Sequence, residues 1–351
     1  MTQVINMLAC KKFEQYVGLD VHKRTIYGYV MDYEGNKIYE KEFRTEPHEL
    51  DIFLLNVKKD DSLVVIESCS CWQYSYDYLH QAGYNLKLAH PLGVKALKKL
   101  RKHTDRDDAK LLADLLRTNM LPESYAAPND VRVKRQITRH RSSITQVENQ
   151  IQNKVHAILL RHGYDVPFSD AFCKSALAHM KNINLPECDR FELDQYLSTL
   201  ELLKSKKEEC TAVIKRIADD DPHIRNAMTM PGVGHYIATT FVAEVGDVRR
   251  FKNADKVASF AGLTPRVHQS GQTLKLGHIT KQGNTNLRHV MVQAANVAVQ
   301  HDATLRKTYN RLKHKGHNKA IVAVARRMVT LLYVMLKHNI NYQDLQIHKA
   351  T

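Results

Sequence analysis

The sequence predicts an N-terminal α/β domain, a helical arm, and a mainly helical, basic C-terminal domain. Three observations support this order. Short apolar runs that end in acids occupy the first third, isoleucines with a seven-residue period follow Pro128, and amphipathic segments rich in Lys and Arg fill the last third. We place the domains at residues 1–126, 127–220 and 221–351.

The first domain opens with three expected strands. Gln15–Asp20 is a short apolar run, and Thr25–Met31 and Lys37–Phe43 have strand-like composition. The turn Glu34-Gly35-Asn36 joins the second run to the third. These runs predict an antiparallel meander.

Strands and helices then alternate. Ser62–Glu67 is continuously apolar before its final acid, which is typical of a strand buried on both faces. A helix is expected over Tyr74–Gln81 with Gly83 ending it, a strand over Asn85–Ala89, and a further helix after Thr104, a suitable N-cap. The order β-β-β-α-β-α-β-α indicates an α/β domain.

Two long helices are expected in the middle third. Isoleucine recurs every seven residues at Ile137, Ile144, Ile151 and Ile158. No Gly or Pro falls between Asn129 and Arg161, and Arg190–Ile217 carries leucines at helical spacing. This pattern indicates an antiparallel coiled-coil arm that serves for spacing or self-association. The repeat is short and its other seam is polar, so an ordinary helical-bundle segment is the alternative.

The net charge of the chain is concentrated in its last third. The chain has 52 Lys and Arg against 37 Asp and Glu, and residues 221–351 hold 19 of the former and 6 of the latter. Two late amphipathic helices are expected there, at about Thr285–Gln300 and Asn318–His338. A basic domain of this kind indicates a polyanionic partner, with a merely solvated basic surface as the alternative.

Membrane insertion and disulfide bonding are not expected. No apolar run approaches the roughly 20 residues that span a bilayer. The six cysteines show no C-x-x-C spacing, so we expect a cytoplasmic protein without structural zinc.

Four acids of the first domain are candidate metal ligands: Asp20, Glu67, Asp105 and Asp108. The first two end apolar strands and the last two share one face of a helix, whereas Asp107 suits a capping box with Thr104. Carboxylates at buried strand ends are costly unless they are paired or bind metal. A ligand set without Cys or His favours Mg²⁺ or Mn²⁺, which can serve phosphodiester chemistry. The alternative is solvent-facing acids that favour a helix N-terminus.

Taken together, these residues resemble the DEDD transposases of the IS110 family of insertion sequences and their relatives, the pilin-gene invertases. The likeness covers nearly the whole chain in the same order. Its segments are Tyr16–Lys23, Val64–Ser68, Thr104–Ala113, Met230–Gly234, Phe260–Arg266 and Ser270–Asn284.

The resemblance implies a RuvC-like, ribonuclease-H-type first domain in which Asp20, Glu67, Asp105 and Asp108 are the catalytic, metal-binding acids. Asp107 leaves open which neighbour is the fourth acid, and helix spacing favours Asp108. The resemblance also implies that Ser270 is a nucleophile toward DNA, and that a structured noncoding guide RNA pairs with donor and target DNA.

A serine hydroxyl is a weak nucleophile that needs a base or a metal for activation. Ser270 has no obvious partner nearby in sequence, so it would have to use the acid site of the same or another subunit. Together with the arm, this requirement favours a homo-oligomer, either a dimer or a tetramer. Alternatively, Ser270-Gly271 is only a turn.

Several C-terminal residues are candidates for nucleic-acid binding. Gly232 and Gly234 precede an apolar helix, as in a helix-hairpin-helix, although a plain turn fits equally well. The cations Lys275, His278, Lys281 and Arg288 suit phosphate contacts, or are simply solvated. A further basic cluster begins the arm, at Arg132, Lys134, Arg135, Arg139 and Arg141.

The sequence therefore predicts a DNA transposase or recombinase that cuts and rejoins strands. One alternative is a metal-dependent Holliday-junction or structure-specific nuclease in which Ser270 is inert. Another is a nonenzymatic nucleic-acid scaffold. An actin-like nucleotide-binding fold is disfavoured because the expected glycine-rich phosphate loops are missing from the first domain.

Overall fold

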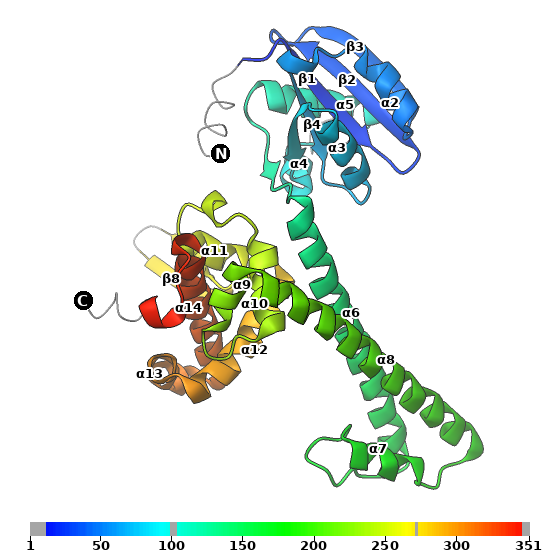
Figure 1. The fold of residues 1–351 in the computed structure, drawn as a ribbon, viewed down its shortest axis with the longest axis vertical. Coiled ribbons are helices and arrows are strands. Elements are labelled where there is room, and N and C mark those ends of the chain that lie inside the picture. Colours follow the sequence, from blue (N-terminus) through cyan, green and yellow to red (C-terminus); the bar gives the residue numbers. More distant parts are fainter. Residues whose placement is uncertain (1–11, 99–103, 271–272, 346–351) are drawn as a thin grey trace. The chain divides into compact units, whose positions relative to one another are not determined.

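A computed structural model describes residues 12–98, 104–270 and 273–345 of the chain. The chain divides into two compact units, residues 1–126 and 127–351 (Figure 1). The region expected to form the arm lies in the same unit as the C-terminal helices. None of the helices in the described ranges is long and apolar enough to cross a membrane.

Unit 1 is built on a mixed six-stranded sheet with the order β3-β2-β1-β4-β5-β6. Strands β1 (Gln15–Val21), β2 (Thr25–Asp32) and β3 (Lys37–Arg44) form the predicted antiparallel meander. The turn between β2 and β3 is held by the Asp32 carboxylate, which accepts hydrogen bonds from three successive backbone amides.

The next two strands of the sheet run parallel to β1. Strand β4 (Ser62–Glu67) pairs with β1 and with β5 (Asn85–Ala89), and every residue of β4 before Glu67 is buried, as its apolar sequence predicts. The two-residue strand β6 (Glu123–Ser124), which we did not expect, adds an antiparallel edge. This mixed sheet is consistent with the ribonuclease-H-type domain that the resemblance implies.

Helices cover both faces of the sheet. On one face, α2 (Pro47–Leu54) and α3 (Trp72–Gln81) pack on Val17, Leu19 and Ile66. On the other face, residues of α4 (Pro91–Lys98) and α5 (Asp105–Arg117) form a second core with Tyr16 and Val65. A short 3-10 turn, Lys59–Asp61, leads into β4.

Helix α5 lies directly against β1 at Gly18. A Cβ atom at this position would lie 2.0 Å from the carbonyl oxygen of Ala109 and 2.8 Å from the amide nitrogen of Ala113. Both distances are far below the contact distance of nonbonded heavy atoms. Glycine is therefore required for this approach, which places the first turn of α5 at the end of β1.

Unit 2 begins with two long helices, α6 (Asn129–Arg161) and α8 (Glu187–Asp220), with α7 (Lys174–Lys181) between them. The two long helices are antiparallel, because their side-chain contacts progress in opposite directions along the chain. The contacts are Arg161 with Asp189, Glu148 with Lys207, Arg141 with Thr211, and Lys134 with Asp221. The coiled-coil character of this pair stays a prediction.

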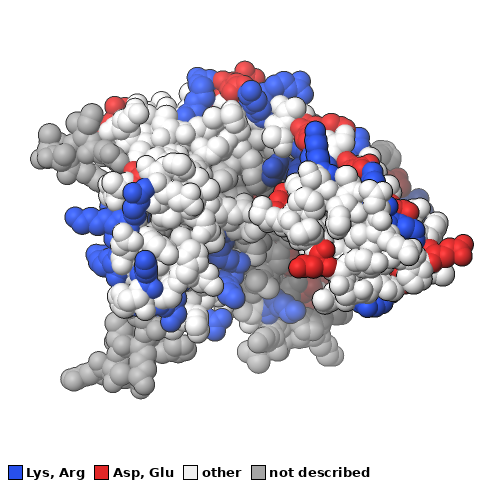
Figure 2. Space-filling model, turned by 90° about the horizontal axis from the view of Figure 1, so that it is seen from below, with Lys and Arg blue, Asp and Glu red and all other residues white. Residues whose placement is uncertain are grey.

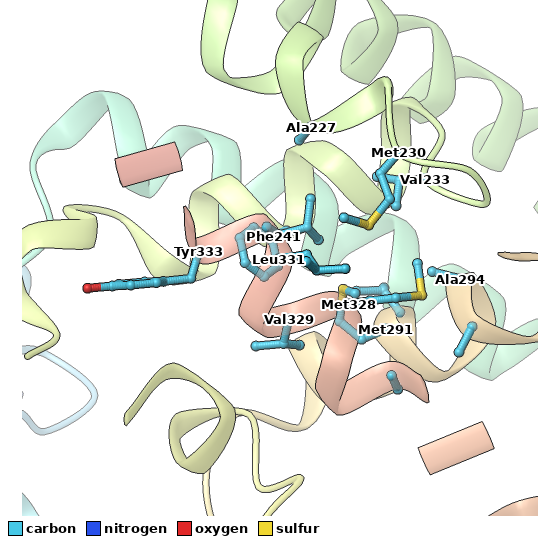
Figure 3. Packing of buried hydrophobic residues seen from close by; sticks show 14 of the residues in the cluster. Ala227, Met230, Val233, Phe241, Met291, Ala294, Met328, Val329, Leu331 and Tyr333 are labelled. Carbon is cyan, nitrogen blue, oxygen red and sulfur yellow. The ribbon is translucent and has the colours of Figure 1, made fainter. Parts of the chain in front are cut away.

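The remaining helices of unit 2 form a bundle around one large apolar core. They are α9 (Pro222–Met228), α10 (His235–Val245), α11 (Ala254–Phe260), α12 (Thr285–His301), α13 (Ala303–Leu312) and α14 (His317–His338), with short 3-10 turns at Val248–Arg250 and Lys313–Lys315. Figure 3 shows side chains of α10, α12 and α14, among them Phe241, Met291 and Met328, meeting in this core.

One part of the last third is not helical. Strands β7 (Pro265–Ser270) and β8 (Thr273–Ile279) form an antiparallel hairpin between α11 and α12. The sequence analysis expected at most a turn at Ser270-Gly271 and did not predict these paired strands.

A buried carboxylate joins the arm to the bundle. Glu244 of α10 has a side chain that is 1% exposed, and Arg139 of α6 donates two hydrogen bonds to it, each of 2.7 Å. Asn284, the N-cap of α12, donates a third. Burial alone would raise the pKa of Glu244, but the Arg139 guanidinium and the Asn284 amide outweigh burial and lower that pKa below its ordinary value.

We predict that Glu244→Gln destabilises unit 2 by about 3 kcal/mol at neutral pH, because it leaves the arginine charge uncompensated. A carboxylate with a depressed folded-state pKa stabilises the protein above its unfolded value of 4.5. The difference between wild type and variant should therefore shrink as the pH falls below that value. Urea unfolding followed by circular dichroism measures both effects. Glu208→Gln, on an exposed position of α8, is the control, and a pH-independent difference would contradict the prediction.

We predict that Gly18→Ala destabilises unit 1 by about 3 kcal/mol or more, because the new methyl group must displace α5. The single tryptophan of the chain, Trp72, lies in α3, so its fluorescence reports on unit 1 during urea unfolding. Lys110→Ala, on the exposed side of α5, should change the free energy of unfolding by less than about 0.5 kcal/mol. Equal stability of the two variants would refute the close-packing argument.

Candidate active site

The side chains of β1 alternate between the two faces of the sheet. Gly18 faces α5, so Asp20 lies on the same face. His22 continues this alternation just beyond the strand. Asp20 is 8% exposed, so its carboxylate lies at the buried end of the strand.

The parallel pairing of β1 with β4 brings the two strand-ending acids to the same level. Leu19 is in register with Ile66, and the residues that follow them are Asp20 and Glu67. Neighbouring strands are about 4.8 Å apart. Val65 packs in the core that α5 covers, so Glu67, two residues later, lies on that same face.

The first turn of α5 supplies the other acids. Thr104 caps the helix by accepting a hydrogen bond from the backbone amide of Asp107, and its hydroxyl donates to the Asp107 carboxylate at 2.7 Å. The expected cap is therefore present, with Asp107 bonded to the threonine hydroxyl. Asp105 and Asp108 lie on the face of the helix that continues into Ala109.

Three side chains converge where β1 meets α5. The His22 Nε2 atom lies 3.2 Å from Asp20 Oδ2 and 3.5 Å from Asp105 Oδ1. One potential ligand atom of each residue lies within 4.8 Å of those of the other two. Within the described ranges, these three side chains form a group close enough together to hold a metal ion. Two carboxylates and one imidazole can hold a divalent cation.

The structure brings two of the four predicted acids, Asp20 and Asp105, into the convergent group. Glu67 lies outside this group at the neighbouring strand end, and Asp108 lies outside it in the same first turn of α5 as Asp105. His22 was missed by the sequence reasoning, although its spacing from Asp20 is the one that puts two strand side chains on one face. The acid-only ligand set stays a prediction, and the structure adds His22 as a neighbour of Asp20 and Asp105.

Two ionic or polar contacts hold this region in place. Arg106 donates two hydrogen bonds of 3.0 Å to Glu40 of β3 and so ties the start of α5 to the sheet. The thiols of Cys69 and Cys71 both donate to the backbone carbonyl of Val21. Burial raises the pKa of the Cys69 thiol to about 11, so it remains a hydrogen-bond donor at neutral pH and keeps the segment after Glu67 next to β1.

The predicted nucleophile lies in the other compact unit. Ser270 is the last residue of β7, paired with Thr273 across the end of the hairpin. This position at the hairpin end is compatible with the alternative that Ser270-Gly271 is a turn. The role of Ser270 as a nucleophile stays a prediction. Lys275 lies on β8, opposite His268.

The other candidates for nucleic-acid binding differ in their surroundings. Gly232 has a positive φ of 82°, and a Cβ there would lie 2.5 Å from the carbonyl oxygen of Ala294, so α12 requires glycine at this position. Gly234 is exposed at the N-terminus of α10 with open space around it. His278 and Lys281 are exposed, whereas Arg288 donates hydrogen bonds to the backbone carbonyls of Lys281 and Ala261.

The cations at the start of the arm serve largely within the protein. Lys134 pairs with Asp221, Arg135 and Arg139 bind α10 around Glu244, and Arg141 lies over the ring of Tyr236. Charge on the bundle is nevertheless mostly positive on the face seen at the left of Figure 2, while the tip of the arm, at the right, mixes both signs.

Comparison with known proteins locates these features within a family. A family model of IS110-type DEDD transposases matches residues 17–163, which include the convergent group. A second model, described as the transposase IS116/IS110/IS902 family, matches residues 224–310. The chain belongs to the IS110 family of DEDD transposases.

Relatives span most of the chain. The transposase of insertion sequence IS1328 from Yersinia enterocolitica is 25% identical over 81% of this chain and 84% of its own length. The IS1111A transposase of Coxiella burnetii is 24% identical over 93% and 91%. A pilin gene-inverting protein of Moraxella bovis is 32% identical over 34% and 38%. Both family models describe transposases, and the chain is an enzyme of the DNA transposase and recombinase class.

We predict that Mn²⁺ stabilises the protein by binding the convergent group. At a free Mn²⁺ concentration one hundred times the Kd of the site, the free energy of unfolding should rise by about 2.7 kcal/mol. Asp105→Asn should weaken this binding at least tenfold, because it removes a charged ligand. Asp114→Asn is the matched control, since it makes the same change in the same helix beyond its first turn and outside the group. Equal Mn²⁺ affinity of the two variants, measured by calorimetry, would rule out Asp105 as a ligand.

Proposed function

We propose that this transposase cuts and rejoins DNA with a metal site at the end of β1 and a serine in the β7–β8 hairpin. The observation that carries the proposal is the convergence of Asp20, His22 and Asp105 within the segment that matches the DEDD transposases. The proposed substrates are donor and target DNA in the cytoplasm.

In this proposal, Asp20 and Asp105 provide negative charge and His22 a neutral nitrogen for one divalent ion, Mg²⁺ or Mn²⁺. Glu67, at the end of the strand next to β1, and Asp108, in the first turn of α5, are the proposed further ligands. A divalent ion held there would supply Lewis-acid stabilisation of charge on a phosphodiester. The protein contributes the rigid frame, because Gly18 fixes α5 and Arg106 anchors its first turn.

Ser270 is the proposed nucleophile. Its hydroxyl oxygen would bond to phosphorus, the bond from phosphorus to one strand end would break, and the hydroxyl proton would pass by way of a base to the leaving oxygen. The acids and Ser270 belong to different compact units. The chemistry therefore requires the two units to meet at the DNA, within one chain or between copies in a dimer or tetramer.

Sequence recognition is proposed to depend on a structured noncoding RNA that pairs with donor and target DNA. The protein would then hold nucleic acid mainly through its backbone, which suits the acid-free stretch between Asp255 and Asp302. The proposed contacts from this stretch are Lys275, His278 and Lys281. Gly234, at the N-terminus of α10, is a further proposed contact.

We predict that Asp20→Asn and Ser270→Ala each reduce strand transfer about 100-fold or more while DNA binding persists. Strand cleavage and strand transfer are measured separately on supercoiled plasmid, with and without transcripts of the DNA that flanks the gene. A covalent serine–DNA adduct trapped on a nicked substrate should map to Ser270 by mass spectrometry.

Ser259→Ala, another serine of the same unit, is the control and should retain activity. Undiminished strand transfer by Ser270→Ala, or an adduct on a different residue, would reject the nucleophile. Cleavage without strand transfer in the wild type would favour the nuclease alternative.

A further inference from the structure

A groove of about 570 Å³ lies between the arm and the bundle of unit 2. Its walls come from α6, the first turn of α10, the end of β8 and the first half of α12. Each wall belongs to the same compact unit, and the Glu244 network ties α6 to α10 and to the N-cap of α12. The groove is therefore a preformed feature of that unit.

The chemistry of the lining points to a polyanion. None of the described residues that line the groove is acidic. Four can carry positive charge and four are amides: Arg141, Lys281, Arg288, His289, Gln146, Asn149, Asn286 and Gln293. Cations neutralise phosphates, and amides can donate to and accept from base edges. A simple solvated basic surface would not need this set of amides in a concave site.

Arg141 provides a planar cation whose orientation is set from two sides. Its guanidinium carbon lies 4.1 Å from the centre of the Tyr236 ring, and its Nε donates to the Thr211 hydroxyl at 3.0 Å. Unpaired bases stack on aromatic rings and on guanidinium planes. A base within a duplex is already stacked on its neighbours, so this arrangement favours an unpaired strand.

Arg288 sets the opposite wall. It donates a hydrogen bond of 3.1 Å to the backbone carbonyl of Lys281, a residue with a left-handed backbone and φ of 53°. The Lys281 and His289 side chains are exposed, and within the described ranges neither forms an ion pair. Charge is thus available on the wall that faces the amides of α6.

We propose that this arm–bundle groove binds an unpaired nucleic-acid strand, with Lys281 on phosphate, Gln146 and Asn149 on base edges, and the Arg141–Tyr236 pair as a stacking platform. The inference rests on the proposed function only in taking nucleic acid as the partner. RNA and DNA strands share the phosphates and bases that the groove would contact, and the 2′-hydroxyl is what separates them.

The test measures binding of labelled oligonucleotides by fluorescence anisotropy. Single-stranded RNA, single-stranded DNA of the same sequence, and duplex DNA are compared for the full chain. The double variant Gln146→Ala/Asn149→Ala should weaken binding of one or both single strands about tenfold. Lys281→Gln should lower the slope of log affinity against log salt by about 1.

Lys204 is an exposed lysine on α8 outside the groove, so Lys204→Gln is the matched control for charge. It should change the slope of log affinity against log salt by less than about 0.5. Photocrosslinking with thiouridine-containing strands should label the peptides around residues 141–149 and 285–293. A tenfold or greater preference for RNA would assign the site to RNA, and equal affinities would assign it to features that both strands share.

Three results would overturn the proposal: unchanged single-strand affinity in the groove variants, equal losses in Lys204→Gln, or crosslinks confined to other peptides. The outcome is separable from the proposed function. A protein that binds strands in this groove but never recombines DNA would reject the transposition chemistry and leave the groove in place.

Discussion

The geometry of the candidate active site depends on the close approach of α5 to β1 at Gly18. Strand ends and helix starts are separate in sequence, and only direct backbone packing brings Asp105 to Asp20 and His22. A side chain at position 18 would push the helix outward by the width of a methyl group. Since metal ligands tolerate displacements of only a few tenths of an ångström, this glycine is as necessary to the site as the acids themselves.

In the second unit, a buried charge, and not a close backbone approach, fixes how the arm and the bundle pack together. Glu244 is removed from water and is stabilised by Arg139 from the arm and Asn284 from the start of α12. Such a pair adds little net stability compared with an apolar contact, but it specifies which surfaces meet. The position of α6 relative to α12, and with it the shape of the groove between them, follows from this arrangement, because α6 and the N-cap of α12 are both hydrogen-bonded to the Glu244 carboxylate.

Much of the fold could be predicted because its signals are local. Apolar runs with terminal acids located β1 and β4, a threonine cap located the start of α5, and the absence of Gly and Pro located α6. The β7–β8 hairpin was not predicted, since strands such as Pro265–Ser270 alternate weakly and depend on each other for pairing. The arrangement of the candidate site was predicted in part: Asp20 and Asp105 lie together, and His22, which the sequence analysis did not consider, lies beside them. The basic start of the arm was assigned to nucleic acid, whereas most of its cations contact partners 70 or more residues away in the sequence.

Sequence alone determined the strand and helix order of the first domain apart from α4 and β6, the family to which the chain belongs, and the acids available for metal. It could do so because periodicity, caps and motifs are encoded within a few residues. Tertiary structure decided which of those acids share a site, which arginines are neutralised, and where an acid-free groove opens. Each of these depends on distances between residues far apart in the chain, and those distances follow from packing at Gly18 and around Glu244.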